Sequence, residues 1–175
     1  VSNPNTLDSK NTVIRTAAMD CYILPCEYMG FDTTSIASSD TFAALQTGVV
    51  EGLAGSTPAG AYLNYRDIID YYYAYQMSPE VTQIMISEKT LAKLSPEDQK
   101  TIVDICRQEC ANSVNYAKEE DEKYLKLMED NGIKIVRFTD EEIEMFAEAV
   151  RTNVWPQLAK TYGEDFINEL LKLYK

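Results

Sequence analysis

The sequence predicts an α/β fold in which a parallel-type sheet is flanked by helices and followed by a long helix and shorter C-terminal helices. Two observations support this prediction. In the first half of the chain, short β-rich runs alternate with segments of helical spacing, an order typical of a parallel α/β sheet. In the second half, apolar residues recur at helical spacing from about residue 96 to about residue 130, and few helices of globular proteins are that long. The length of 175 residues and the hydrophobic fraction of 45% suit one domain, or a domain and a half.

The chain begins with a polar segment, residues 1–10, which is expected to be a loop or linker. The strands expected after it are residues 13–16, 31–36 and 49–53. The helices expected between these strands are residues 20–29, where Pro25 makes the pattern uneven, and residues 41–47. Gly30 and Gly48 are the expected helix ends, and Ser38-Ser39-Asp40 offers an N-cap to the second helix.

A tyrosine-rich run follows, and residues 70–76 are expected to form a strand. Alternation places Tyr71, Tyr73 and Tyr75 on one face of this strand, and Tyr72 and Ala74 on the other. Residues 81–87 alternate in the same way and predict a further strand, which a helix at residues 88–94 follows.

The longest helix is expected to begin after the N-cap residue Ser95, with Pro96 at its first position and acidic residues in its first turn. Asn131-Gly132 is its expected end, and its length suggests a spine or a coiled-coil strand. The elements expected after it are a strand at residues 133–138, a helix capped by Thr139, and an amphipathic helix at residues 163–174. Trp155-Pro156 is expected to interrupt or kink the chain before the last helix.

Composition excludes several classes of function. The formal net charge of −12 and the pI of about 4.4 argue against electrostatic binding to nucleic acid or to an anionic membrane surface. The chain has no histidine, which removes Ser-His-Asp catalysis, Cys-His catalysis and the usual zinc sites. Neither local cysteine pair has C-x-x-C spacing. Cys106 and Cys110 share one helix face, and we favour two small buried apolar residues there over a metal clip. No cofactor, metal site or catalytic residue is therefore expected.

The ends of the sequence carry little information on the compartment. No stretch of about 18 apolar residues is present, so no transmembrane helix is expected. The sequence shows no signal peptide, but it begins at Val1 without a methionine, which suggests a processed protein or part of a longer one.

The segment AALQTGVVEGLAGSTP, residues 43–58, is unusual for a buried segment. Helix formers lead to Gly48 and two β-branched residues, and small or flexible residues follow. Small residues at the end of a strand leave room for a ligand, and they let backbone N–H groups approach a bound anion. A tight turn from strand to helix with no ligand is the alternative.

Three segments carry a resemblance to a known family: VIRT at residues 13–16, FAALQTGVVEG at residues 42–52 and LSPEDQK at residues 94–100. The chain resembles the extracytoplasmic solute-binding proteins of TRAP transporters, the DctP-like family. The three segments match motifs of that family, and they occur in the same order and at the same spacing. ALQTGVVEG is close to the family's ALQTGVVDG and is the most specific of the three. The resemblance covers nearly the whole chain.

The resemblance implies a periplasmic-binding-protein-like lobe. Family proteins have two α/β lobes around a ligand cleft, and this chain is similar to the C-terminal part, so the N-terminal lobe is expected to be absent. The implied division is a linker at residues 1–10, a ligand-binding lobe at 11–80, a hinge-return strand and spine helix at 81–132, and a C-terminal strand and helices at 133–175.

The resemblance also implies the site. Arg15 falls on the family's arginine that resembles a carboxylate clamp, and a guanidinium suits this role because it gives a carboxylate two parallel hydrogen bonds. Gly55, Ser56 and Thr57 replace an asparagine that often touches the ligand in the family, and Pro58 suits the first turn of a helix whose positive end faces the ligand. Tyr75 and Gln76 fall where the family chain returns towards the hinge, and core packing is the alternative for the tyrosines.

The function that this resemblance implies is the capture of a small organic acid outside the cytoplasm, in the periplasm or at a membrane-associated surface, for delivery to TRAP membrane permease subunits. Two alternatives remain open. The long helix and the C-terminal helices suit an interaction module that self-associates, and an acid–base enzyme could use paired carboxylates such as Asp67 and Asp70.

Overall fold

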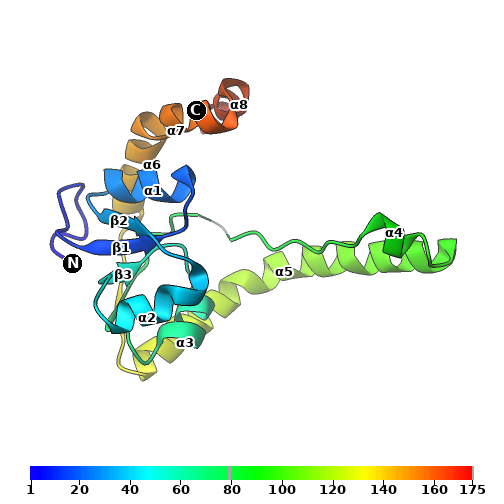
Figure 1. Cartoon of the computed structure of the whole chain (residues 1–175), viewed down its shortest axis with the longest axis horizontal. Helices are drawn as coiled ribbons and strands as arrows, with labels where there is room; N and C mark the ends of the chain where they lie inside the picture. The colour runs from blue at the N-terminus through cyan, green and yellow to red at the C-terminus, as the bar shows by residue number, and fades with distance from the viewer. Residues whose placement is uncertain (79, 175) are drawn as a thin grey trace.

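The computed structural model describes residues 1–78 and 80–174. It shows a body with two small parallel sheets, an arm built around one long helix, and three C-terminal helices above the body (Figure 1). This architecture confirms the predicted α/β class.

The first sheet has the strand order β2-β1-β3, and both of its strand pairs are parallel. Its strands are β1 (Val13–Thr16), β2 (Asp32–Ser35) and β3 (Gly52–Leu53). Arg15 in the central strand pairs with Thr34 on one side and with Leu53 on the other. The third strand is shorter than expected, because the N–H groups of Val49 and Val50 both donate to the Ala44 carbonyl at the end of the preceding helix.

Helices follow each of these strands, as the alternating pattern predicts. They are α1 (Asp20–Tyr28), the short 3₁₀ helix η1 (Ser38–Asp40) with α2 (Thr41–Gln46), and α3 (Pro58–Tyr65). Gly30 ends α1 at a φ of +88°, where its own N–H donates to the Glu27 carbonyl and the Phe31 N–H donates to the Cys26 carbonyl. Both expected glycine stops, Gly30 and Gly48, are confirmed.

The second sheet pairs β4 (Tyr71–Tyr73) with β5 (Lys134–Val136) in parallel. The alternation of its tyrosines is confirmed. The Tyr71 and Tyr73 rings are stacked with centroids 6.0 Å apart, and those of Tyr73 and Tyr75 are stacked at 6.1 Å. Tyr72 lies on the opposite face and packs against the buried cluster of Ala61, Leu125, Met128 and Ile133.

The arm consists of α5 (Pro96–Asp130), the short helix α4 (Glu88–Leu91) and the segment that leads to them. The C-terminal part of α5 packs on the body under α3, and its N-terminal part projects away beside α4 (Figure 1). Ser95 is the N-cap, as predicted, because its Oγ accepts the Asp98 N–H at 3.1 Å.

The prediction of a strand at residues 81–87 is wrong. The residues from 80 to 86 have no regular secondary structure and lie exposed, and they form no backbone hydrogen bond with the rest of the described chain. Alternation reports which side chains share a face, but a strand also needs a neighbouring strand to complete its backbone hydrogen bonds, and none of the described strands lies beside this segment.

The C-terminal helices are α6 (Asp140–Asn153), α7 (Trp155–Tyr162) and α8 (Glu164–Lys172). Thr139 caps α6, since its Oγ1 accepts the Glu142 N–H at 3.2 Å and its own N–H donates to Glu142 Oε2 at 2.9 Å. The interruption expected at Trp155-Pro156 is confirmed, because α6 ends just before this pair and α7 begins with it. Val154, Leu158 and Ile167 form the buried core of this region.

Residues 1–10, expected to be a linker, pack closely against the body. Lys10 is only 1% exposed, its N–H donates to the Gly30 carbonyl at 2.7 Å, and its Nζ donates to the carbonyls of Thr6 at 2.6 Å and Asp8 at 3.0 Å. Burial lowers the pKa of Lys10, while the charge of Asp8 opposes that shift.

All four cysteines are free. Cys106 is half-buried and Cys110 is exposed, so the prediction of two buried apolar residues is wrong for Cys110, which lies on the projecting part of α5. Within residues 1–78 and 80–174, no helix is both long and apolar enough to cross a membrane.

Candidate functional site

The candidate site lies at the carboxyl edge of the three-stranded sheet. The three strands are parallel, so their carboxyl ends meet at one edge, and the helices α1 and α3 begin just beyond it. In open α/β sheets this edge is the usual place for a ligand, because helix N-termini there offer unpaired N–H groups and partial positive charge.

Arg15 is half-buried near the end of the central strand β1. Its Nε donates to the Ile36 carbonyl at 2.8 Å, just beyond the end of β2. No other side-chain hydrogen bond and no ion pair of Arg15 occurs in the part of the chain that the structure describes. The bond to Ile36 orients the guanidinium, and its two terminal nitrogens make no hydrogen bond among the described residues. Two such nitrogens can in general donate in parallel to the two oxygens of a carboxylate.

Thr16, the next residue, lies on the opposite face of β1 from Arg15. It is fully buried, and its Oγ1 has no hydrogen-bond partner within the described residues. A buried hydroxyl without a partner costs about 1–3 kcal/mol, so such groups are rare away from functional sites. Because Thr16 is fully buried on that other face, a ligand held by Arg15 would not contact its hydroxyl.

The loop between β3 and α3 lies against the end of β1. The Ala54 N–H donates to the Arg15 carbonyl at 2.9 Å, which places Gly55, Ser56 and Thr57 beside the arginine backbone. Gly55 has a φ of +82°, and a Cβ at this position would lie 3.1 Å from Cε1 of Tyr22. Glycine therefore lets the loop close on α1 without strain.

Thr57 also has a structural role. It is the N-cap of α3, since its Oγ1 accepts the Gly60 N–H at 3.1 Å, and Pro58 occupies the first turn, as predicted. The neighbouring Ser56 hydroxyl has only a long contact of 3.4 Å to the Thr57 carbonyl. Of the two hydroxyls, that of Ser56 is the more available to a ligand.

Tyr75 and Gln76 do not lie beside Arg15 and the loop at residues 55–57. Tyr75 is buried, its hydroxyl donates to the Pro4 carbonyl at 2.6 Å, and its ring stacks on Phe138 with centroids 4.4 Å apart. Burial raises the pKa of Tyr75, and the neighbouring Tyr73 adds to the shift. Its ring also packs edge-on against Phe31, which precedes β2 and so lies at the amino edge of the sheet.

Gln76 follows as an exposed residue with a φ of +51°, in the left-handed region that few residues other than glycine adopt. No hydrogen bond joins it to Arg15 or to residues 55–57 in the described chain.

Tyr72 is a residue near the site that sequence reasoning missed. Its hydroxyl donates to the Ser56 carbonyl at 3.4 Å. Burial raises the pKa of Tyr72 to about 12, with a smaller contribution from the negative charge of Asp121 on α5. Alternation placed Tyr72 opposite to Tyr71 and Tyr73, but nothing in the pattern shows that this face leads to the loop before α3.

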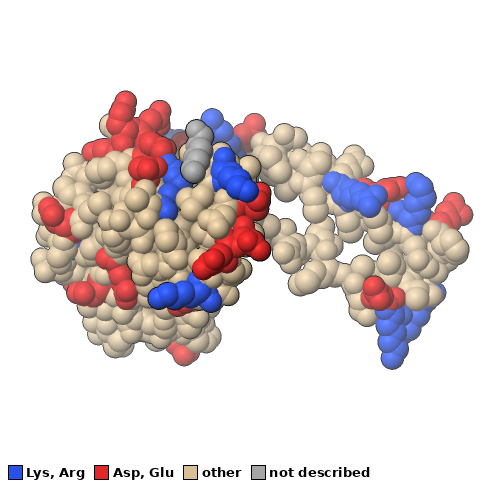
Figure 2. Space-filling view, turned by 90° about the horizontal axis from the view of Figure 1, so that it is seen from above, with Lys and Arg blue, Asp and Glu red and all other residues tan. Residues whose placement is uncertain are grey.

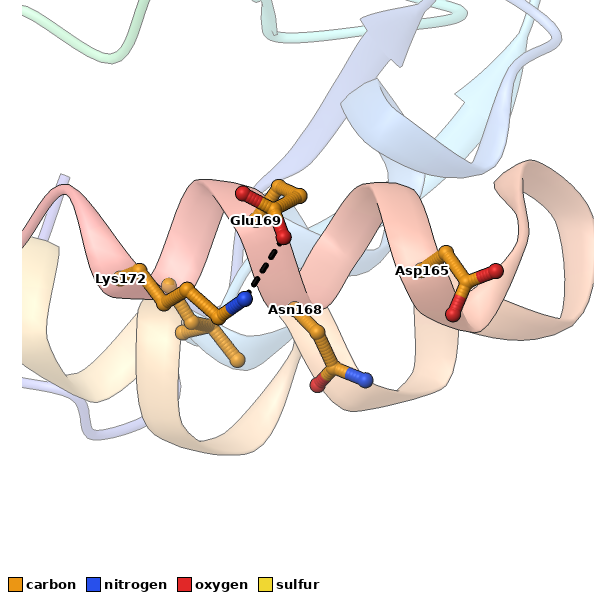
Figure 3. Close-up of a pocket in the computed structure, with 5 residues that line it drawn as sticks. Asp165, Asn168, Glu169 and Lys172 are labelled. Atoms are coloured by element: carbon orange, nitrogen blue, oxygen red, sulfur yellow. Dashed lines mark hydrogen bonds and ion pairs between the residues drawn. The ribbon is translucent and has the colours of Figure 1, made fainter.

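A pocket elsewhere in the molecule is a poor candidate. It lies on α8 and is lined by Asp165, Asn168, Glu169, Leu171 and Lys172 (Figure 3). All of these residues belong to one helix, which cannot enclose a ligand, and Lys172 Nζ already donates to Glu169 Oε1 at 2.6 Å.

The candidate acid–base pair and possible metal ligands were compared across the described residues. Asp67 and Asp70 are both exposed, and the contact of Asp67 is to its neighbour Arg66, at 3.9 Å. Among the described residues, no group of three or more metal-ligating side chains is placed to hold an ion.

Comparisons with known proteins concern the family and the fold of the chain. The family model "Bacterial extracellular solute-binding protein, family 7", also called DctP, matches residues 5–161. A comparison with curated protein sequences gives no match.

Solved structures of TRAP periplasmic solute-binding proteins share the fold. A protein of Escherichia fergusonii in an apo open form is 21% identical, with a TM-score of 0.74 over 97% of this chain and 55% of that chain. A protein of Pseudomonas putida F1 with bound D-glucuronate is 18% identical, with a TM-score of 0.68 over 93% of this chain and 51% of that chain. A protein of Shewanella oneidensis with bound succinate is 17% identical, with a TM-score of 0.70 over 94% of this chain and 53% of that chain. The chain thus spans about half the length of these structures.

Proposed function

The chain belongs to family 7 of the bacterial extracellular solute-binding proteins, and on this basis we propose that it serves a TRAP-type transporter by capturing a small organic acid outside the cytoplasm. The resemblance seen in its sequence motifs and the periplasmic-binding-protein-like fold are thereby confirmed. The family is one of solute-binding proteins and not of enzymes. Delivery of the acid to membrane permease subunits, from the periplasm or from a membrane-associated position, is part of the proposal.

The proposal rests on the position and contacts of Arg15. Its guanidinium is oriented by the Ile36 carbonyl and forms no ion pair in the described chain, at the sheet edge where ligands of such folds bind. D-Glucuronate and succinate, the ligands bound to the Pseudomonas and Shewanella proteins, both present a carboxylate that an arginine can hold through two parallel bonds. The loop at Gly55, Ser56 and Thr57 completes the proposed site.

Titration calorimetry with D-glucuronate and with succinate tests the proposal. Arg15→Ala is expected to weaken binding roughly 10- to 100-fold, because hydrogen bonds to charged groups contribute about 1.5–3 kcal/mol. Arg15→Lys is expected to restore only part of the affinity, since lysine keeps the charge but not the planar fork. Arg137→Ala is the matched control, because Arg137 is an exposed arginine paired with Glu122 on α5.

Binding that persists undiminished in Arg15→Ala would remove the clamp and keep the receptor. Absence of binding to either acid would contradict the proposal as a whole.

A second candidate function, a helical interaction module, is favoured by the arm. Large apolar side chains on it are exposed: Met77, Val81, Ile84, Met85, Ile86, Ile105, Val114 and Tyr116. Seen from above, a stretch of the arm between the body and its far end shows few charged side chains, and a group of charged side chains lies at the far end (Figure 2). Apolar surface of this kind marks an interaction site, and a second copy of the chain is the proposed partner. Light scattering over a range of concentrations tests this, and a monomer at every concentration would contradict it.

A further inference from the structure

Cys106 and Cys110 form a pair of thiols on the projecting part of α5 (Figure 1). Both cysteines are free. They lie four positions apart in a helix that runs without interruption from Pro96 to Asp130, so they share one face of it. The sequence favoured two small buried apolar residues here, but Cys110 is exposed and Cys106 is only half-buried. Burial in a core therefore does not explain this pair.

The helical spacing decides what the two sulfurs can do together. Residues four apart on a helix have Cβ atoms about 5–6 Å apart, whereas a disulfide needs Cβ atoms about 3.5–4.5 Å apart. A regular helix thus opposes a disulfide between them. A cation held in line between two thiolates separates the sulfurs by about 4.6 Å, twice a metal–thiolate bond of about 2.3 Å. Each sulfur lies one rotatable bond beyond its Cβ, so this span fits the spacing without bending the helix.

The number of ligands limits the class of cation. Within residues 1–78 and 80–174, no group of three or more Cys, Asp or Glu side chains is placed to hold an ion, so the two thiolates stand as a two-ligand set. Zinc in structural sites takes four ligands, and calcium and magnesium take oxygen ligands. Thiolates are soft ligands that select Cu(I), a cation that two sulfurs in line can satisfy.

The local charges do not oppose such a complex. Two thiolates and Cu(I) together carry one negative charge. Asp104 is paired with Lys100 at 2.6 Å, and the other charged neighbours in the sequence, Arg107 and Glu109, have opposite signs. Arg107 is three positions before Cys110 and so adjacent to it on the helix surface, which favours negative charge on that sulfur.

We propose that Cys106 and Cys110 bind one Cu(I) ion between their two thiolates. The cation replaces the thiol proton of each residue, so two protons are released for each ion that binds and no electron is transferred. The site lies on the arm and does not involve Arg15, so the proposal stands independently of carboxylate capture.

An anaerobic competition for Cu(I) tests the proposal on the full chain. The metal is supplied as its coloured complex with the chelator bicinchoninate, and loss of colour measures transfer to the protein. One Cu(I) per chain is expected to transfer. Cys106→Ala and Cys110→Ala are each expected to weaken binding more than about 100-fold, because loss of an outer-shell partner alone costs about 10- to 100-fold. An equal concentration of Zn²⁺ is expected not to displace the Cu(I).

A shifted thiol gives the matched control. Cys110→Ala combined with Ala111→Cys keeps the number of thiols but moves one of them off the shared face, and it is expected to weaken binding as much as Cys110→Ala alone. Circular dichroism checks that the helix content of each variant is unchanged.

The other two cysteines give a second control. Cys21 and Cys26 lie five positions apart in α1, and Cys26 is only 1% exposed. Burial, with a smaller contribution from the negative charge of Glu27, raises the pKa of Cys26 to about 12, so this thiol keeps its proton at neutral pH. Cys21→Ala is expected to leave Cu(I) binding unchanged.

Three results would overturn the proposal. Undiminished binding by the shifted variant would mean that any two thiols suffice. A stoichiometry of one Cu(I) per two chains would mean that thiols of a second copy complete the site. Failure to remove Cu(I) from bicinchoninate under conditions in which the small dithiol dithiothreitol removes it would mean that the pair does not chelate.

Discussion

Gly30 gives a sharp test of how the N-terminal segment is held, because a matched glycine exists elsewhere in the chain. Gly30 and Gly48 both end a helix, at φ values of +88° and +72°, and both are followed by the same pair of hydrogen bonds back into the last turn. Their surroundings differ. A Cβ on Gly30 would lie 2.2 Å from the Asp8 carbonyl oxygen, whereas nothing lies within 4 Å of a Cβ on Gly48.

The expected costs follow from this difference. Alanine in the left-handed region costs about 1–2 kcal/mol, and both Gly30→Ala and Gly48→Ala incur this cost. Gly30→Ala must also displace the backbone at Asp8, which disturbs the three hydrogen bonds of Lys10 to the carbonyls of Gly30, Thr6 and Asp8. At about 0.5–1.5 kcal/mol for each bond, the additional loss is about 2–4 kcal/mol.

Urea denaturation of both variants measures the difference in the free energy of unfolding, and thermal melting gives a second reading of about 2–4 °C per kcal/mol for a chain of this size. Hydrogen exchange at the Lys10 amide is expected to accelerate in Gly30→Ala and to stay unchanged in Gly48→Ala. Equal destabilisation of the two variants would refute the reasoning, because residues 6–10 would then contribute nothing to the stability of the body.

Two more predictions concern the cores. Met128 is fully buried, so Met128→Ala is expected to lower the free energy of unfolding by about 2–5 kcal/mol in urea, whereas Val114→Ala, on the exposed part of the same helix, is expected to change it by less than about 0.5 kcal/mol. Burial raises the pKa of Tyr75 above its unfolded value of about 10, so the folded state keeps a proton that the unfolded state releases, and stability is expected to fall as the pH rises above about 10. Tyr75→Phe is expected to reduce the fall of the free energy of unfolding with pH, measured by urea denaturation between pH 9 and pH 11. An equal fall in Tyr75→Phe and in the unsubstituted protein would contradict the attribution to Tyr75.

Local signals predicted the elements well where the cause of an element is itself local. Gly30, Gly48 and Gly132 each end a helix at a positive φ, and Ser95 and Thr139 cap theirs. Each of these residues acts within a few positions of its own sequence, so the pattern contains the physical cause.

Long-range placement could not be predicted in the same way. The alternation at residues 81–87 is real, but pairing depends on a neighbouring strand that periodicity does not report. Similarly, alternation correctly put Tyr75 on the face of Tyr71 and Tyr73, yet only the structure shows that this face packs on Phe138 and Phe146 and not at the edge of Arg15. Arg15 was singled out by the resemblance to the family and not by periodicity, and the structure places it near the carboxyl end of the central strand of a parallel sheet.

The placement of Tyr72 connects the candidate site to the arm. Its backbone pairs with Ile135 in the second sheet, its ring packs against Leu125 and Met128 at the base of α5, and its hydroxyl reaches the Ser56 carbonyl in the loop after β3. The chain leaves this sheet through Gln76, at a φ of +51°, and enters the arm. Tyr72 thus supports the loop beside Arg15, and its own position depends on the buried base of α5.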